Sequence, residues 1–158
     1  MAASTTSSTP WPWRRTRYSA RWPSSTTVCG LDEIALSVLT TVIGHQPERG
    51  WIMIDAGWMA LSRDRGTQEQ AVDRGYGMVC DVAGTVLDGW TVSGANQERG
   101  MVACTRAGAQ DNIEKVFPIG TRLRILPNHA CATGAQHGSY HVLRGADASR
   151  TWPRFTGW

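Results

Sequence analysis

Apolar residues from Ile34 onward come in short runs rather than in the 3.6-residue rhythm of long helices. The first run is IALSVLTTVIG, over residues 34–44. On an extended chain, both of its faces would be largely apolar, and β-branched side chains are frequent in it. That pattern predicts a strand buried on both faces, with a helix starting at Asp32 as the alternative. The segment HQPERG then supplies a turn, and WIMIDAG predicts a second strand that ends at Gly57.

The rest of the chain repeats this rhythm. Short apolar runs are separated by Gly, Asp, Asn or Pro, and they read GYGMVCDV, TVLDGWTV, MVACT, TRLRILP and YHVLRG. Their spacing of about 10 to 15 residues is typical of an antiparallel sandwich or barrel. Only DRGTQEQAVDR, over residues 64–74, suggests a helical turn. We therefore expect a mainly β fold, built as a small antiparallel β barrel or sandwich.

Residues 1–28 have a different composition, dominated by Ser, Thr, Pro, Arg and Trp. They hold no apolar stretch of about 7 to 15 residues, so they do not fit a secretory signal peptide. Their acid-free, Arg-rich composition is similar to that of an organelle transit peptide, but Pro10, Pro12 and Pro23 interrupt an amphipathic helix. We expect a disordered or non-native leader over residues 1–28 and one domain over residues 29–158.

The net charge of +3 comes from the leader. Residues 1–31 carry four arginines and no acid, whereas residues 32–158 carry twelve basic and thirteen acidic side chains. The domain therefore lacks the basic face of a nucleic-acid-binding protein. No run of about 18 apolar residues is present, which excludes a transmembrane helix. We expect neither nucleic acid nor a membrane as a partner.

Four cysteines lie far apart and form no Cys-x-x-Cys pair; they are Cys29, Cys80, Cys104 and Cys131. In a chain of this length, such spacing indicates reduced thiols rather than a disulfide framework. Together with the missing signal peptide, it predicts a cytoplasmic protein.

The most informative motif is Pro127-Asn128-His129-Ala130-Cys131, which follows the apolar run RLRIL. On an extended chain, His129 and Cys131 project from the same side. Imidazole and thiolate together form a ligand set that zinc favours. Either His137 or His141 completes the site, or its open positions face water and substrate. The alternative is a packed thiol beside a solvent-facing histidine.

Two polar stretches follow predicted strands. The first holds Asp55, Gly57 and Asp64, where a tight backbone passage is expected and the acids either serve a site or accept hydrogen bonds from turn N–H groups. The second, NQERG over residues 96–100, is typical of a polar hairpin connection. His45 lies in a polar turn, and we expect it to be exposed.

Five segments carry a family resemblance in their order along the chain, namely DEIALSVLTTVIG, IDAGWMALSRDRG, NQERG, LRILPNHACAT and TWPRFTGW. They resemble the carboxy-terminal β domain of the D-serine dehydratase and D-threonine aldolase family. Those proteins are alanine racemase-like, fold type III pyridoxal-phosphate enzymes, in which an amino-terminal α/β barrel precedes the β domain. The likeness covers residues 29–158, and PNHAC is its most specific motif.

The resemblance implies a division of labour. His129 and Cys131 match the positions that bind zinc, or another divalent metal, beside the cofactor. An α/β barrel domain or subunit would be the partner that holds pyridoxal phosphate, and the fold type implies a homodimer. The substrate would be a β-hydroxy-D-amino acid, undergoing D-serine dehydration or D-threonine retro-aldol cleavage. Cysteine at the second metal position is characteristic of the dehydratases.

The chain also departs from the family. Lys115 is its single lysine and matches no cofactor-binding motif, so the chain alone is expected not to bind pyridoxal phosphate. The family usually reads Glu-His-Gly where this chain has Glu98-Arg99-Gly100. No catalytic residue is assigned. We interpret the chain as the metal-binding domain of a truncated lyase; the alternatives are a stand-alone zinc-binding subunit and a non-catalytic remnant.

Overall fold

The computed structural model describes residues 31–155 except 107, 109–110 and 145–146. The expected leader over residues 1–28 lies outside the described residues. The chain divides into two compact units, residues 1–33 and 34–158. Of the first unit, only the 3-10 turn η1 (Leu31–Glu33) is described. Residues 34–37 lie in no helix and a strand begins at Val38, so the alternative of a helix starting at Asp32 is wrong. No described helix is long and apolar enough to cross a membrane.

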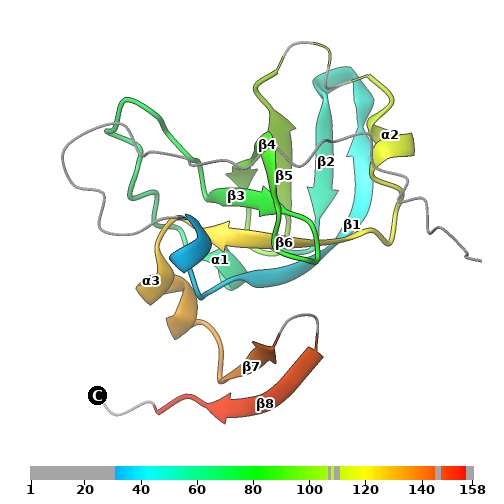
Figure 1. The fold of residues 1–158 in the computed structure, drawn as a ribbon. Coiled ribbons are helices and arrows are strands. Elements are labelled where there is room, and N and C mark those ends of the chain that lie inside the picture. Colours follow the sequence, from blue (N-terminus) through cyan, green and yellow to red (C-terminus); the bar gives the residue numbers. More distant parts are fainter. Residues whose placement is uncertain (1–30, 107, 109–110, 145–146, 156–158) are drawn as a thin grey trace, which may run out of the picture. The chain divides into compact units, whose positions relative to one another are not determined.

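Six antiparallel strands of the second unit close into a barrel (Figure 1). In the order β1-β2-β5-β4-β3-β6, they are β1 (Val38–Gln46), β2 (Trp51–Ile54), β5 (Gly100–Cys104), β4 (Val86–Ala95), β3 (Gly77–Cys80) and β6 (Arg122–Pro127). A separate hairpin is formed by β7 (Ser139–Arg144) and β8 (Asp147–Pro153). Between the strands lie short helices: η2 (Pro47–Arg49), α1 (Trp58–Leu61), α2 (Ile113–Val116) and α3 (Ala130–Ala135). The predicted mainly β, antiparallel barrel is confirmed.

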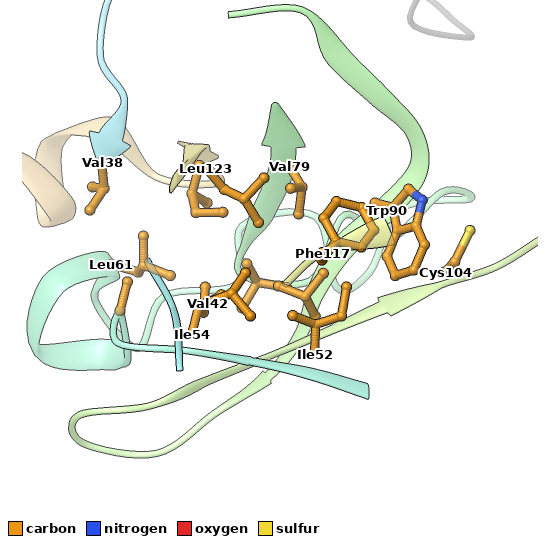
Figure 2. Packing of buried hydrophobic residues seen from close by; sticks show 14 of the residues in the cluster. Val38, Val42, Ile52, Ile54, Leu61, Val79, Trp90, Cys104, Phe117 and Leu123 are labelled. Carbon is orange, nitrogen blue, oxygen red and sulfur yellow. The ribbon is translucent and has the colours of Figure 1, made fainter. Parts of the chain in front are cut away.

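The barrel interior is filled by side chains of alternate residues of the six barrel strands. Figure 2 shows their packing. On β1, Val38 and Val42 point inward and are buried, while Leu39 and Ile43 are 61% and 42% exposed. The prediction that this strand is buried on both faces is therefore wrong. In a closed barrel only the inner face meets the core, and the described helices leave the outer side of β1 uncovered at these two positions.

Phe117, directly after α2, completes this core. Its ring packs edge-on against Trp90 of β4, with ring centroids 4.9 Å apart, and both side chains are almost fully buried. The carbonyl of Phe117 accepts a hydrogen bond from Nε2 of His45, at 2.7 Å. His45 belongs to β1 and is half-buried. The expectation of an exposed turn histidine is wrong because β1 continues as far as Gln46.

The hairpin between β4 and β5 holds the start of α1. Within the hairpin, Asn96 pairs with the backbone of Arg99, which confirms the predicted polar connection. The carbonyls of Asn96 and Gln97 accept hydrogen bonds from Trp58 N and Met59 N, the first two amides of α1. Gly57 allows this approach, because a Cβ there would lie 2.3 Å from the carbonyl oxygen of Asn96. The expected tight backbone passage after β2 is thus present, and it sets where α1 begins.

Candidate metal centre

The His129–Cys131 pair lies at the junction of β6 and α3, which confirms its expected position after a strand. His129 is the residue before α3 and has an extended backbone, with φ −131° and ψ 99°. Cys131 belongs to the first turn of α3 and is exposed. The two residues do not share one extended segment, contrary to the prediction. The run Ala130-Cys131-Ala132 begins a helix instead, and alanine is the strongest helix former.

His129 contacts a carboxylate from a distant part of the chain. Its Nδ1 lies 2.5 Å from Oδ2 of Asp64, which is 65 positions away in sequence. The two side chains are 43% and 51% exposed. A carboxylate accepts a hydrogen bond from Nδ1–H, and this leaves the lone pair on Nε2. Nε2 of His129 takes no part in this contact.

Asp64 is held by the turn that ends α1. The hydroxyl of Ser62 accepts a hydrogen bond from the Asp64 backbone N–H at 3.2 Å. Ser62 is buried, and its φ of 73° lies in the region that favours glycine. A non-glycine residue in this conformation is strained, and the surrounding structure has to hold it. Here the amide of Ser62 donates to Trp58 O at 2.7 Å.

α3 is tied directly to α1. The buried hydroxyl of Thr133 donates to the carbonyl of Leu61 at 2.6 Å, and Nε2 of His137 donates to the carbonyl of Ala60 at 3.0 Å. Both carbonyls belong to the last turn of α1, where a helix has no internal partners for its C=O groups. These two bonds hold α3, which contains Cys131, against the end of α1, which leads into Asp64.

Asn128 fixes the strand end that precedes His129. Its side-chain amide donates to Thr67 Oγ1 at 2.8 Å and to Gly75 O at 2.6 Å. Its own backbone N–H donates to Tyr76 O at 3.1 Å. With both amide protons and the backbone proton engaged, Asn128 joins the end of β6 to the loop over residues 65–76.

Asp73 organises that loop. Burial by itself would raise the pKa of its carboxyl, but the Gly75 N–H, the Arg65 guanidinium and the Thr67 hydroxyl together lower the pKa below the usual value. The Gly75 N–H donates to Oδ1 of Asp73 at 2.8 Å, and Arg65 forms an ion pair with the same carboxylate. Asp73 is thus charged at neutral pH and keeps Thr67 and Gly75 where Asn128 meets them.

The other candidate ligands are engaged elsewhere. Nε2 of His137 is used by the bond to α1, and Nδ1 of His141 lies 3.3 Å from Thr151 Oγ1 across the β7–β8 hairpin. In the part of the chain that the structure describes, no three His, Cys, Asp or Glu side chains are grouped to hold a metal. The structure therefore brings neither histidine to His129 as a third ligand.

The remaining polar candidates either join strands elsewhere or are exposed. Asp55 accepts hydrogen bonds from Thr40 Oγ1 and from the backbone N–H of Thr41, at 2.5 and 2.8 Å, so it joins β2 to β1. Arg99 is exposed in the β4–β5 hairpin. Lys115 is exposed in α2. Of the polar residues considered from sequence, Asp64 alone is brought to His129.

Burial separates the described cysteines into two kinds. Cys80 and Cys104 are buried, and Cys131 is exposed. Burial raises the pKa of the Cys80 thiol to about 12, with the nearby Arg124 guanidinium opposing the shift and Asp81 adding to it. Burial also raises the pKa of Cys104, against the Arg106 backbone N–H. Both buried thiols therefore stay protonated near neutral pH.

Iodoacetamide at pH 8 is expected to alkylate Cys131 and to leave Cys80 and Cys104 unmodified, because only a thiolate reached by solvent reacts. The difference should persist for Cys80 at pH 10, well below its pKa of about 12. Tandem mass spectrometry of the native chain measures the modification at each site. In the control, denatured in urea, all three residues should react. Rapid labelling of Cys80 in the native chain would contradict the barrel core.

The comparisons with known proteins agree with this fold. The family model described as "Putative serine dehydratase domain" matches residues 35–143. D-threo-3-hydroxyaspartate dehydratase of Delftia sp. (strain HT23) is 56% identical over 131 residues, which are 83% of this chain and 34% of that protein. D-serine dehydratase of Dictyostelium discoideum is 31% identical over 118 residues, covering 73% of this chain and 28% of that protein. The chain thus spans roughly a third of the length of these relatives.

Solved structures give the same match. The Delftia enzyme superposes with a TM-score of 0.79 at 55% identity, over 84% of this chain and 35% of its own. An alanine racemase-like protein from Idiomarina loihiensis gives a TM-score of 0.75 at 51% identity, over 84% of this chain and 34% of its own.

Two solved variants of a D-threo-3-hydroxyaspartate dehydratase, each 55% identical to this chain, bear on the site. One replaces a histidine by alanine, and the other replaces a cysteine two positions further on and is described as a metal-free form. In this chain His129 and Cys131 are the histidine and cysteine with that spacing. The match over residues 35–143 and the 56% identity confirm the predicted resemblance, and the chain belongs to the serine dehydratase domain family, with an alanine racemase-like β domain.

Proposed function

We propose that this chain is the metal-binding β domain of a pyridoxal-phosphate-dependent lyase that removes water from a β-hydroxy-D-amino acid. The observation that carries the proposal is the pair His129 and Cys131 at the β6–α3 junction, with the Nδ1 of His129 engaged by Asp64. The 56% identical relative is a dehydratase of a β-hydroxylated amino acid. Dehydration is therefore the proposed reaction, and retro-aldol cleavage is not.

The residues present fit a divalent metal of the zinc class. An imidazole nitrogen and a thiolate are the donors that zinc prefers over oxygen-only sites. His129 is partly exposed and Cys131 is exposed, so both can be reached. With two ligands from this chain, the other coordination positions belong to substrate, water or a partner domain. A bound metal would supply Lewis-acid assistance to the departing β-hydroxyl.

The residues that bind pyridoxal phosphate would belong to a partner domain or subunit. The chain covers 34% of the Delftia enzyme, and the proposed partner is an α/β barrel, in the same polypeptide or as a separate subunit. Pyridoxal phosphate on that barrel would stabilise the negative charge that forms when the α-proton is removed. In this division His129 and Cys131 hold the metal, while the bonds from Asn128 and Thr133 keep the β6–α3 junction in place.

Zinc binding tests the proposal. The purified chain should take up one zinc ion, and both His129→Ala and Cys131→Ser should weaken binding by at least about 100-fold, because each removes one of two protein ligands. Binding should also weaken on acidification, since protons compete with the metal for both ligands. The measurement is titration calorimetry combined with metal analysis by mass spectrometry.

His141→Ala is the matched control for this test. It removes an imidazole from β7, where the ring contacts Thr151, and it should leave zinc binding unchanged. Full zinc content in the Cys131→Ser variant would disprove the proposed site. An equal loss in His141→Ala would show that the zinc is not held at the β6–α3 junction alone.

A further inference from the structure

We propose that Asp64 is a positioning residue for the metal centre. By accepting the Nδ1–H of His129, it selects the ring tautomer and the ring orientation that offer Nε2 to the metal. This inference rests on the proposed function, because it assigns a role toward the metal that His129 and Cys131 are proposed to hold. The contact joins two sequence stretches, SRD at residues 62–64 and NHAC at residues 128–131, that spacing along the chain does not connect.

The chemistry of the contact determines the tautomer. A neutral imidazole carries one proton, on either Nδ1 or Nε2. An ionised carboxylate accepts hydrogen bonds and donates none. The distance of 2.5 Å between Oδ2 of Asp64 and Nδ1 of His129 therefore requires the proton on Nδ1. Nε2 then carries the lone pair that a metal needs, and a metal-binding histidine commonly donates its other N–H to a carboxylate in this way.

Both partners are anchored independently of their contact. On one side, Ser62 accepts the backbone N–H of Asp64 while holding a strained φ of 73°. On the other side, Asn128 makes two side-chain bonds to the loop over residues 65–76, and Thr133 donates to Leu61. These bonds position the two backbones. The Asp64–His129 contact is left to determine how the imidazole ring is turned.

The Asp64–His129 contact is expected to add little to the free energy of unfolding. The side chains of Asp64 and His129 are 51% and 43% exposed, so water and salt screen their attraction. Exposed ion pairs contribute little to the free energy of unfolding. A strained backbone next to a solvent-exposed carboxylate is more consistent with orienting a neighbouring group, since strain of this kind clusters at functional sites.

The test compares Asp64→Ala with Asp64→Asn in the full chain. Zinc affinity is measured by competition with a chromophoric chelator, and the tautomer of His129 is read from long-range proton–nitrogen NMR spectra of the metal-free chain. Asp64→Ala should shift His129 away from the Nδ1–H tautomer and weaken zinc binding by about 10- to 100-fold. Asp64→Asn keeps an oxygen acceptor without charge, so it should restore the tautomer and part of the affinity.

Asp81→Asn is the matched control. Asp81 is likewise a turn aspartate, but its turn lies between β3 and β4, where its carboxylate accepts the backbone N–H of Thr85 at 2.8 Å. This variant should keep the zinc affinity and the histidine tautomer of the parent chain. Circular dichroism checks that each variant retains the barrel.

Three outcomes would overturn the inference. The first is an Asp64→Ala variant with the parent tautomer and an affinity within twofold of the parent, which would make the contact an ordinary surface pair. The second is complete loss of zinc in both Asp64 variants, which would make Asp64 a ligand. The third is a parent chain whose His129 carries its proton on Nε2. If the parent chain binds no zinc, the proposed function fails, and the tautomer comparison still decides whether Asp64 orients the ring.

Discussion

Replacing Phe117 with alanine is expected to lower the free energy of unfolding by about 3–5 kcal/mol. The side chain is 1% exposed and packs edge-on against Trp90, 4.9 Å away between ring centroids. Removing the ring leaves a cavity in the barrel, because close-packed neighbours relax only in part. Urea unfolding followed by tryptophan fluorescence measures the change, and the closeness of Trp90 makes the signal sensitive to this region.

Phe155→Ala is the control for the same chemical change. Phe155 is 92% exposed, so its truncation should shift the free energy of unfolding by less than about 0.5 kcal/mol. Phe117 follows α2 outside the strands, and its burial is a feature of the three-dimensional structure alone. A change below about 1 kcal/mol for Phe117→Ala would contradict the packing in which this residue completes the barrel core.

A chimeric enzyme should show the largest effect on activity. In it, residues 34–158 of this chain replace the matching third of the Delftia dehydratase, to which they are about 55% identical. If the proposed function is correct, the chimera dehydrates D-threo-3-hydroxyaspartate, and Cys131→Ser in the chimera lowers kcat/KM by at least about 100-fold. That factor corresponds to about 2.7 kcal/mol of transition-state stabilisation, within the several kcal/mol that a metal supplies.

The assay follows the 2-oxo acid, which forms when elimination of water leaves an enamine that tautomerises to an imine, and one water then hydrolyses the imine with release of ammonia. His141→Ala in the chimera is the matched control and should retain the parent activity, since this imidazole contacts Thr151 on the hairpin. The chain of 158 residues by itself should give no turnover and should not hold pyridoxal phosphate as an internal aldimine, because its single lysine, Lys115, is exposed in α2 and matches no cofactor-binding motif. Turnover by the chain alone would contradict the proposed division of labour.

The positions of most strands could be predicted from the sequence. Alternating and β-branched runs placed β1 to β7 near their observed positions, and their spacing indicated an antiparallel sandwich or barrel. The error at β1 has a physical cause. Leu39 and Ile43 are apolar, but closure of six strands assigns them to the outer face, and periodicity cannot report which face has a partner. His45 was misjudged for a related reason, since the end of a strand depends on the pairing of Gln46 with Trp51.

Of the candidate site, only the two proposed metal ligands could be predicted from the sequence. His129 and Cys131 stand two positions apart, and a histidine and a cysteine at such short spacing can be recognised in the sequence alone. Asp64 was visible as an acid in a polar stretch, but nothing in that stretch links it to His129. Its contact depends on α1 starting directly after Gly57, where the β4–β5 hairpin accepts the first amides of the helix, and on the hydrogen bond from Thr133 of α3 to Leu61.

The sequence by itself thus determined the β class, the family and the two proposed metal ligands, because hydrophobic periodicity and short motifs are local properties of a chain. The tertiary structure alone decided which strand face is buried and which carboxylate meets His129. Those features follow from barrel closure and from hydrogen bonds between segments about 60 to 75 residues apart, such as Asp64 with His129 and Thr133 with Leu61. Contacts of that range are set by the packing of the whole barrel, and no local pattern encodes them.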